Sequence, residues 1–451
     1  MTTIIKQGLE RPVESESDLL GYLLGGARPR EDWGIGAESE RLALVDATGE
    51  AAPFERIERL LKSLLEAGSW EPILESGRLI GLKGQSSQIT LEPGAQVELS
   101  GTFCHDIHCS YADLMAHFQP LLEVAREQGL LFLGLGVQPF STLEDIAWVP
   151  KARYDVMGPY MLRTGDMGQR MMKQTAGLQV NLDFSDEADC VEKLRVSQWL
   201  SPLLYALFAN SPLLDGRPSG FLSTRGEIWS RTDAQRSGII PALFEEGATL
   251  DAYVQYALDV PMYFIHREGR YLDMTSKPFS FRRYLNEGIG AHRALLADWD
   301  MHLSTIFTEV RLRPQIEVRT PDCLPSRLTF AVAALLKGLL YDEEARAAIR
   351  RRFSGLMLEE FLTLYRASWR LGLKTPMKGG TLRDFALEAI ELARAGLRRQ
   401  AEFSGGLDES SFLDGLDEIA GSGVTLAERL LKEWKGTRAE KLALLRRHCA
   451  L

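Results

Sequence analysis

The stretch Glu309-Val-Arg-Leu-Arg-Pro-Gln-Ile-Glu-Val-Arg319 alternates strictly between polar and apolar side chains. Successive side chains of a β-strand point to opposite faces, so residues i, i+2 and i+4 share one face. The alternation therefore predicts a strand over 309–319 with one polar and one apolar face. The polar face would carry Glu309, Arg311, Arg313, Gln315, Glu317 and Arg319.

Other predicted strands repeat this pattern of polar residues on one face. The run 178–184 alternates, the segment 34–40 carries acidic residues two positions apart, and a turn at Pro93-Gly94 lies between two more. Half-exposed antiparallel strands also alternate, so a solvated face remains an alternative for each strand taken alone. The polar residues concerned are Gln179, Asn181 and Asp183, then Glu38 and Glu40, and then Glu92 and Glu98.

Several acidic strand faces in one chain favour an enclosed site over a solvated sheet. Carboxylates two positions apart on a strand lie roughly 7 Å from each other and repel if the face is enclosed. Such carboxylates must be protonated or neutralised by cations, and Mg²⁺ usually brings substrate phosphates with it. Arginines on the same face would bind those phosphates in forked geometry. We therefore expect a curved antiparallel sheet whose concave face holds Mg-nucleotide. A plain solvated sheet is the alternative.

The composition limits the classes of partner. The chain has 451 residues, of which 45% are hydrophobic and 25% charged, as in ordinary globular proteins. A net charge of −10 argues against a surface that coats nucleic acid. No run approaches the roughly 20 apolar residues of a membrane helix. We expect small-molecule substrates, no nucleic acid, no membrane, and a monomer or homodimer.

The order of predicted elements is typical of an α+β fold. Strands and helices mix up to about residue 325, and almost everything from Ser326 onward has helical periodicity. A doubly wound sheet would instead alternate strands and helices throughout. We expect a catalytic antiparallel-sheet core with flanking helices over 1–325, and a helical region over 326–451 packed on the same domain.

The cysteines and the N-terminus predict a cytoplasmic protein with reduced thiols and at most one or two regulatory pairs. Residues 1–11 are charged and lack the apolar core of a signal peptide, and five cysteines are an odd number. The cluster Cys104-His-Asp-Ile-His-Cys109 could ligate zinc, but its spacing matches no common zinc motif. A helix start with reduced thiols is the favoured interpretation.

Seven motifs of the sequence occur in the order that one known family shows. They are Gly34-Ile-Gly-Ala-Glu-Ser-Glu40, Thr90-Leu-Glu-Pro-Gly-Ala-Gln-Val-Glu-Leu-Ser-Gly101, Pro150-Lys-Ala-Arg-Tyr154, Gln179-Val-Asn-Leu-Asp-Phe184, the segment Phe221–Arg236, Pro261-Met-Tyr-Phe264 and His302-Leu-Ser-Thr-Ile-Phe-Thr-Glu-Val-Arg311. In these motifs the sequence resembles the glutamate–cysteine ligases of the plant and bacterial type. The resemblance implies a glutamine-synthetase-like curved antiparallel sheet that forms a half-open funnel. It also implies ATP-dependent ligation of L-glutamate to L-cysteine through γ-glutamyl phosphate, the first step of glutathione biosynthesis.

The resemblance also implies roles for individual residues. ATP is the co-substrate, and two or three Mg²⁺ ions are expected at Glu38, Glu40, Glu92, Glu98, Glu317 and Gln179. Arg319 matches the contact to the γ-phosphate, and Glu309 and Arg311 are expected beside the nucleotide. Arg319 and Arg153 are the expected catalytic residues. The residues expected at the amino-acid substrates are Arg153, Arg225 for the glutamate α-carboxylate, Tyr263 for cysteine, Asn181 and Trp229.

Two other functions remain open. One is a related ATP-dependent carboxylate–amine ligase with another amine acceptor or in another thiol pathway. The other is a non-catalytic binding protein on the same fold. Redox control through the disulfide arrangement of the plant enzymes is not expected here. A disulfide between Cys109 and Cys449 remains open.

Overall fold

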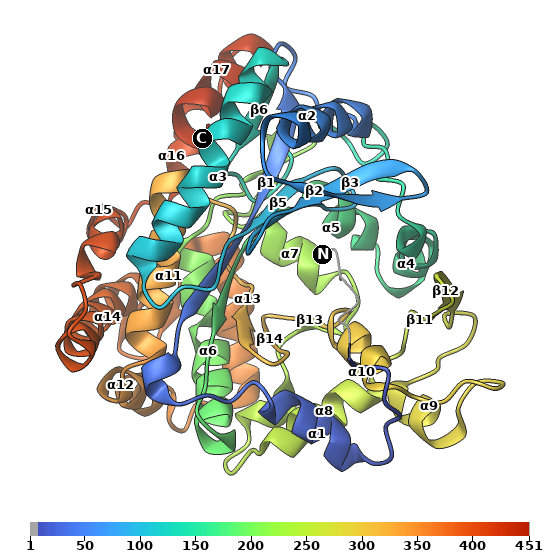
Figure 1. The fold of residues 1–451 in the computed structure, drawn as a ribbon. Coiled ribbons are helices and arrows are strands. Elements are labelled where there is room, and N and C mark those ends of the chain that lie inside the picture. Colours follow the sequence, from blue (N-terminus) through green and yellow to red (C-terminus); the bar gives the residue numbers. More distant parts are fainter. Residues whose placement is uncertain (1–7, 451) are drawn as a thin grey trace.

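The computed structural model describes residues 8–450, and one large antiparallel sheet organises the molecule (Figure 1). Its nine strands run in the order β14-β15-β7-β1-β5-β4-β3-β2, and β6 pairs with the C-terminal half of β1. The expected α+β class is thereby confirmed. The strands are β1 (Ile35–Val45), β2 (Glu71–Glu75), β3 (Arg78–Lys83), β4 (Gln88–Leu91), β5 (Val97–Ser100), β6 (Leu130–Leu133), β7 (Leu178–Leu182), β14 (Val310–Leu312) and β15 (Ile316–Val318).

The stretch 309–319 forms a hairpin, so the prediction of one continuous strand is wrong. β14 and β15 are antiparallel neighbours, joined by the turn at residues 313–315. Pro314 at the centre of this turn has no N–H to donate to a strand ladder. Arg311 pairs with Glu317, and Val310 pairs with Val318. Because each pair joins two odd or two even positions, the polar and apolar faces survive the reversal of the chain.

Helices cover the sheet on its apolar side (Figure 1). α6 packs against β14 and β15, while α11 packs against β7 and β1. Strand residues such as Val180 and Val318 are fully buried in the main hydrophobic core, together with side chains of both helices. The helices are α1 (Glu16–Leu24), α2 (Phe54–Ala67), α3 (Ile107–Glu127), α4 (Ala152–Thr164), α5 (Gly168–Gln174), α6 (Glu187–Leu207), α7 (Thr224–Ser230), α8 (Leu250–Asp259), α9 (Phe281–Glu287), α10 (Leu296–Leu303), α11 (Ser326–Leu340), α12 (Glu343–Phe353), α13 (Leu358–Leu371), α14 (Leu382–Ser404), α15 (Asp414–Ser422), α16 (Leu426–Glu433) and α17 (Arg438–Cys449).

Short elements connect these larger ones. The 3₁₀ helices are η1 (Arg30–Asp32), η2 (Pro241–Phe244), η3 (Gly372–Lys374) and η4 (Ser410–Leu413). The small sheets pair β8 (Leu213–Leu214) with β9 (Arg217–Pro218), β10 (Ser237–Gly238) with β13 (Phe307–Thr308), β11 (Phe264–Arg267) with β12 (Arg270–Asp273), and β16 (Pro376–Met377) with β17 (Gly380–Thr381). Within residues 8–450, no helix combines the length and apolar character needed to cross a bilayer.

Side-chain caps fix the starts of helices that lead out of the sheet region. Asp106 accepts a hydrogen bond from the Cys109 N–H at the start of α3, and Ser223 accepts one from the Gly226 N–H at the start of α7. Such caps satisfy backbone donors that the first turn of a helix leaves unpaired. The predicted turn at Pro93-Gly94 is also present, closed by a 2.9 Å bond from the Ala95 N–H to the Glu92 carbonyl oxygen.

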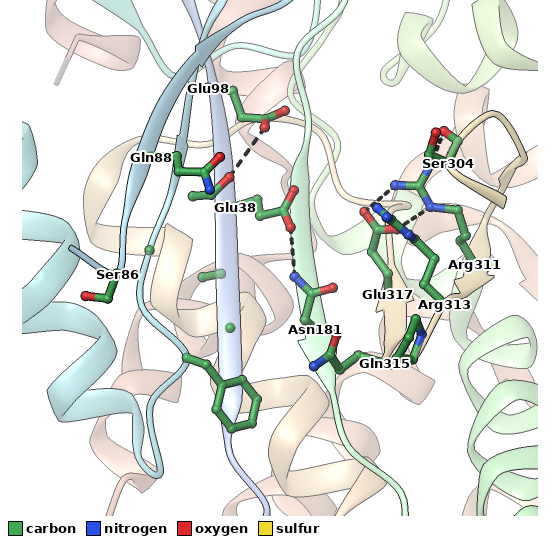
Figure 2. A pocket seen from close by; sticks show the side chains of 16 residues that line it. Glu38, Ser86, Gln88, Glu98, Asn181, Ser304, Arg311, Arg313, Gln315 and Glu317 are labelled. Atoms are coloured by element: carbon green, nitrogen blue, oxygen red, sulfur yellow. Dashed lines mark hydrogen bonds and ion pairs between the residues drawn. The ribbon is translucent and has the colours of Figure 1, made fainter. Parts of the chain in front are cut away.

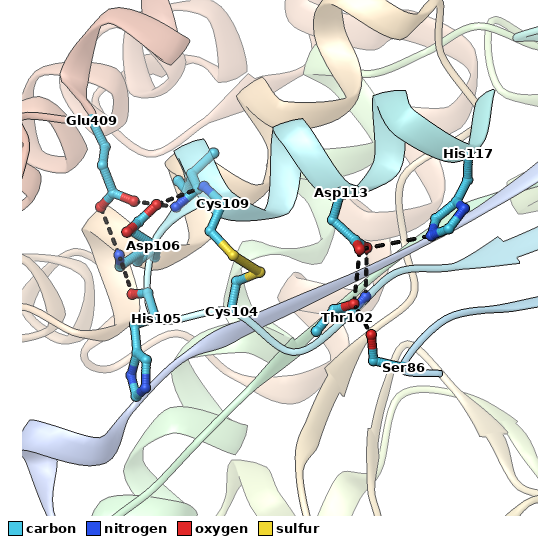
Figure 3. Close-up of a disulfide and its surroundings, with 11 residues drawn as sticks. Ser86, Thr102, Cys104, His105, Asp106, Cys109, Asp113, His117 and Glu409 are labelled. Atoms are coloured by element: carbon cyan, nitrogen blue, oxygen red, sulfur yellow. Dashed lines mark hydrogen bonds and ion pairs between the residues drawn. A yellow bond between two sulfur atoms is a disulfide. The ribbon is translucent and has the colours of Figure 1, made fainter. Parts of the chain in front are cut away.

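A disulfide joins Cys104 to Cys109 at the start of α3 (Figure 3). The expectation of reduced thiols is therefore wrong for this pair, and neither sulfur can act as a thiolate ligand for zinc. Cys449 is buried and free, as are Cys190 and Cys323. The pairing of Cys109 with Cys449, left open from the sequence, is excluded because Cys109 already has a partner.

Candidate active site

A polar cavity of about 480 Å³ lies over the sheet (Figure 2). Strands β1, β4, β5, β7 and β15 contribute side chains to it, and the β14–β15 turn closes one side. The lining residues are Gly36, Ala37, Glu38, Ser86, Gln88, Glu98, Ser100, Gly101, Phe103, Asn181, Ser304, Arg311, Arg313, Pro314, Gln315 and Glu317.

Strand register brings the predicted acidic residues side by side. In an antiparallel sheet, directly opposed residues point to the same face. The opposed pairs are Glu38 with Gln179 and with Ser100, Glu40 with Glu98, and Glu317 with Asn181. Figure 2 shows Glu38 between Glu98 on one side and the group of Glu317, Arg311 and Arg313 on the other. The sheet thus gathers acidic residues that are more than 270 positions apart in the sequence.

The acidic face is enclosed, which excludes the alternative of a solvated sheet. Glu40, Glu98 and Glu317 are 7%, 5% and 4% exposed. Burial, with repulsion from Glu317 and Glu98, raises the pKa of Glu38 to about 7, even though Asn181 donates a 2.9 Å hydrogen bond to its carboxylate. A cation bound nearby would stabilise the ionised form of this carboxyl group and lower its pKa.

Arginines neutralise Glu317. Arg311 Nη2 and Arg319 Nη1 donate to Glu317 Oε1 at 2.9 and 2.7 Å. Burial would raise the pKa of Glu317, but the two guanidinium groups outweigh it and lower that pKa to about 2. Arg311 also donates to the Ser304 carbonyl oxygen at 2.9 Å. The β15 side of the cavity is therefore cationic, and the β1–β5 side is anionic.

The oxygen atoms on this face suit a hard divalent cation. Glu40 accepts hydrogen bonds from the Gly177 N–H at 2.6 Å and from Gln179 Nε2 at 2.7 Å. The other amide atom, Gln179 Oε1, is buried and has no hydrogen-bond partner within the described chain. A buried oxygen without a partner is costly unless a ligand satisfies it. The oxygen donors of Glu38, Glu40, Glu98, Glu317 and Gln179 thus fit Mg²⁺ by their chemistry.

The carboxylates do not, however, converge on one point. Over residues 8–450, no group of three or more His, Cys, Asp or Glu side chains is arranged to hold a metal ion. Each acidic group instead has its own partners, such as Gln179 for Glu40 and Thr90 for Glu98. Four of the expected site residues are buried but do not line the cavity, namely Glu40, Gln179, Arg319 and, in the turn after β4, Glu92. The expected cluster is therefore an acidic face rather than a preformed metal centre.

Glu309 does not face the cavity, in contrast to its predicted place beside the nucleotide. Its carboxylate accepts hydrogen bonds from Tyr205 of α6, at 2.9 Å, and from Tyr365 of α13. Glu309 lies at a bend of the chain between β13 and β14. The alternation that places Arg311 and Glu317 on one face therefore does not extend to this residue.

Arg225 contacts the residues that directly follow β15, and Trp229 lies beside Arg225. Neither residue lines the cavity. Arg225 donates from Nη1 and Nη2 to the carbonyl oxygens of Thr320 and Arg319, both at 2.9 Å. The Trp229 ring centroid lies 5.9 Å from the Arg225 Cζ atom. Arg225 Nε and Trp229 Nε1 are buried and lack hydrogen-bond partners among the described residues. These neighbouring donors could hold an anionic group.

Tyr263 and Arg153 also lie apart from the cavity lining. Arg236 is fully buried, and its Cζ atom lies 3.9 Å from the centroid of the Tyr263 ring. Arg153, at the start of α4, has its Cζ atom 5.5 Å from the centroid of the Phe264 ring. Because Phe264 directly follows Tyr263 in the chain, Arg153 and Tyr263 lie in the same part of the structure.

The cavity also contains residues to which no role was assigned from the sequence. Arg313 and Gln315 belong to the alternating stretch and could have been chosen on that basis. Gln88 begins a short predicted strand, whereas Phe103 and Ser304 follow no periodic signal. Their positions depend on long-range packing of segments far apart in the chain.

The fold resembles that of solved ligases. A glutamate–cysteine ligase from Francisella tularensis, crystallised in complex with AMP, matches with a TM-score of 0.53 at 13% identity, over 92% of this chain and 88% of the other. At this identity the match shows the fold alone.

Sequence comparison is more specific. A model of glutamate–cysteine ligase family 2 matches residues 34–448, so the chain belongs to this family. Chloroplastic glutamate–cysteine ligase B of Oryza sativa subsp. japonica is 41% identical over 92% of this chain and 83% of its own. The chloroplastic enzyme of Arabidopsis thaliana is 40% identical over 94% of this chain and 80% of its own. The resemblance inferred from the motifs is confirmed.

These relatives correct the expected location. They are named as chloroplastic enzymes, whereas the charged N-terminal residues had suggested a cytoplasmic protein. The cytoplasmic expectation is thus contradicted. Residues 1–7, on which part of that expectation rested, lie outside the described structure.

Proposed function

We propose that the protein joins the γ-carboxylate of L-glutamate to the amine of L-cysteine, with ATP as co-substrate, giving γ-glutamylcysteine, ADP and phosphate. This is the first step of glutathione biosynthesis. The observation that carries the proposal is the enclosed face on which Glu38 and Glu98 stand opposite Arg311 and Glu317, with Arg319 bonded to Glu317. Membership of the glutamate–cysteine ligase family supports the choice of substrates.

The reaction needs an activated carboxylate because an unmodified one has a poor leaving group. The glutamate γ-carboxylate attacks the γ-phosphorus of ATP, and ADP departs. The cysteine amine then attacks the resulting γ-glutamyl phosphate and displaces phosphate. Phosphoryl transfer depends mainly on in-line positioning and on neutralisation of charge. Charged residues on a rigid sheet suit both needs.

Each side of the cavity has a part in phosphoryl transfer. Two or three Mg²⁺ ions would be held by Glu38, Glu40, Glu98, Glu317 and Gln179, with Glu92 nearby, and would supply neutralisation of the phosphate charge. Arg319 donates to the transferring phosphoryl group, and Arg311 orients Glu317 through the bond between them. Arg311 and Arg313 line the same cavity and would contact the nucleotide phosphates.

The amino-acid substrates occupy the region of Arg225 and Tyr263. Arg225 Nε and Trp229 Nε1 are buried donors without partners in the described chain, which supports binding of the glutamate α-carboxylate there. Tyr263 and Arg153 contact the cysteine side of the pair, and Asn181 orients the reacting carboxylate from β7. A carboxylate recognised by a buried guanidinium group gains a charge-assisted hydrogen bond.

An assay of the amine acceptor tests the proposal. Purified protein is incubated with ATP, Mg²⁺ and glutamate, and the amine is varied from cysteine to 2-aminobutyrate and to alanine. Phosphate release and product mass are measured together. We expect phosphate release that requires cysteine, with γ-glutamylcysteine as product. Equal phosphate release with and without cysteine would contradict the assignment, and a preference for another amine would indicate the related ligase.

Activity of a Glu317→Gln variant is a second test of the proposed function, with Glu71→Gln as the matched control. Glu71 is an exposed acidic residue of β2, with a side chain 78% exposed. The Glu317 variant should lose turnover, and the Glu71 variant should retain it. Full activity of the Glu317 variant would rule out the proposed role of the acidic face.

A further inference from the structure

An aromatic side chain interrupts the polar lining of the cavity. Phe103 is the only aromatic residue among the described residues that line it. Its side chain is large and apolar, yet the residue is 36% exposed. Leaving a phenyl ring in contact with water forfeits part of the free energy that burial would provide. An exposed ring on the wall of a binding cavity is therefore a candidate contact for a ligand with an apolar face.

The backbone around Phe103 is firmly held. The Ile35 N–H donates to the Cys104 carbonyl oxygen at 2.6 Å, and the Cys104 N–H donates back to the Ile35 carbonyl oxygen at 3.0 Å. On the other side, Asp113 accepts hydrogen bonds from the Thr102 N–H and Oγ1, both at 2.8 Å (Figure 3). The disulfide between Cys104 and Cys109 adds a covalent tie. The ring is thus presented from a fixed segment rather than from a loose loop.

Glycines allow this ring to lie against the start of β1. A Cβ atom at Gly34 would come within 2.6 Å of the Phe103 ring, and one at Gly36 would lie 3.9 Å from it. Arg28 adds a guanidinium group whose Cζ atom is 5.0 Å from the ring centroid. Arg28 and the start of β1 thus cover part of the ring, and a planar ligand could stack on the part that remains exposed.

The position of the ring relative to the charged groups indicates which part of a nucleotide it would contact. Glu38 follows Gly36 by two residues on the same strand face, so roughly 7 Å separates their positions. A nucleotide has a ribose between its base and its phosphates. With the phosphates beside Glu38 and Arg311, the base would reach the part of the cavity lined by Gly36 and Phe103.

We propose that Phe103 is the stacking platform for the nucleobase of ATP in this protein. The proposal rests on the proposed function, because it assumes that ATP binds in this cavity. Stacking on an aromatic ring tolerates any base, whereas amide side chains such as Gln315 can pair with the polar edge of adenine. Phe103 thus contributes affinity for the nucleoside part, while the acidic face and the arginines bind the phosphates.

Direct binding measurements separate these contributions. Calorimetric titration with ADP and with inorganic tripolyphosphate, each with Mg²⁺, is carried out on the wild type, Phe103→Leu and Phe103→Trp. We expect Phe103→Leu to weaken ADP binding roughly tenfold or more, and Phe103→Trp to retain it. Tripolyphosphate, which has no base, should bind all three proteins equally. Phe403→Leu is the matched control, because Phe403 is 65% exposed on α14 and outside the cavity lining.

The outcomes distinguish the platform from the ligase proposal. Equal ADP affinity of the wild type and Phe103→Leu overturns the platform, even if both proteins still produce γ-glutamylcysteine. Equal losses of ADP and tripolyphosphate binding in Phe103→Leu overturn it as well, since that result indicates a distorted cavity. Kinetics give the parallel readout, in which the KM for ATP rises while the KM values for glutamate and cysteine do not. Failure of the cysteine-dependent assay would instead remove the proposed function.

Discussion

At the scale of single residues, the two buried arginines near the end of β15 are expected to act on different steps. Arg319 would stabilise the transferring phosphoryl group, so Arg319→Ala should lower kcat by roughly a hundredfold. Arg225→Ala should mainly raise the KM for glutamate, roughly tenfold or more, because it would hold ground and transition states alike. Steady-state kinetics with each substrate varied in turn test the distinction, and the reverse pattern would exchange the two roles.

Glu38 lies in an environment that opposes its own charge. Burial, Glu317 and Glu98 raise its pKa to about 7, so the folded protein is destabilised by this carboxylate when no cation is bound. In metal-free buffer at pH 8, above the raised pKa, Glu38→Gln should therefore increase the free energy of unfolding by about 3 kcal/mol, while turnover with Mg²⁺ falls. Urea unfolding and the coupled assay measure the two effects. A variant that is both less stable and fully active would contradict this role.

His302 makes stability depend on pH. It is fully enclosed at the end of α10, where Nε2 donates to the Ala257 carbonyl oxygen at 2.8 Å, and burial lowers its pKa from 6.5 to about 3. Between pH 6.5 and pH 3, His302 is protonated in the unfolded chain but stays neutral in the folded protein. Stability from this group is therefore complete above pH 6.5 and falls by up to about 1.4 kcal/mol per pH unit toward pH 3.

The His302→Gln variant isolates this contribution, because an amide can keep the bond to Ala257 without titrating. Urea unfolding between pH 7 and pH 4 should show a shallower loss of stability for the variant than for the wild type. Parallel curves would show that His302 titrates normally in the folded protein.

At the scale of elements, the disulfide at the start of α3 should add modest stability. It closes a loop with a sequence separation of 5, for which chain entropy gives about 2 kcal/mol. Cys104→Ser should lower the free energy of unfolding by that amount, and so should a reductant added to the wild type. The variant itself should not respond to reductant. A wild type unaffected by reductant would exclude a stabilising disulfide.

Strand faces could be predicted from the sequence, but strand connections could not. Period-two alternation placed Arg311, Glu317, Gln179 and Asn181 on the correct faces, because side-chain direction is a local property of a strand. The same signal did not reveal the chain reversal at Pro314, since a symmetric hairpin and a straight strand alternate identically. It also misplaced Glu309. The partners of this residue are Tyr205, 104 residues before it, and Tyr365, 56 residues after it, and strand alternation reports neither.

At the scale of the whole molecule, one hydrophobic core links the sheet to the C-terminal helices. Val180 of β7 belongs to the same buried cluster as Leu335 of α11 and Ala389 of α14. This supports the prediction that 1–325 and 326–451 form one domain. Calorimetry should then show a single unfolding transition for the full chain, and separate transitions would count against it. The expectation of a monomer or homodimer remains a prediction.

The motifs in the sequence were enough to identify the family. The full set of residues that line the cavity could be found only from the folded structure. The resemblance supplied Glu38, Glu98 and Glu317, and sheet register brings them together. Phe103 and Ser304 reach the same cavity only through packing of the segment after β5 and of the end of α10. The disulfide was missed because spacing alone does not report whether two thiols face each other.

The symmetry of the β14–β15 hairpin limits how this part of the gene can change. Inserting or deleting one residue between Leu312 and Ile316 would shift every later position of β15 by one step, sending Glu317 toward the hydrophobic core and Val318 toward the substrates. Substitutions in the turn would be tolerated more readily than changes in its length. Among natural variants of this protein, we therefore expect the spacing of Arg311 and Glu317 to be kept even where the residues between them differ.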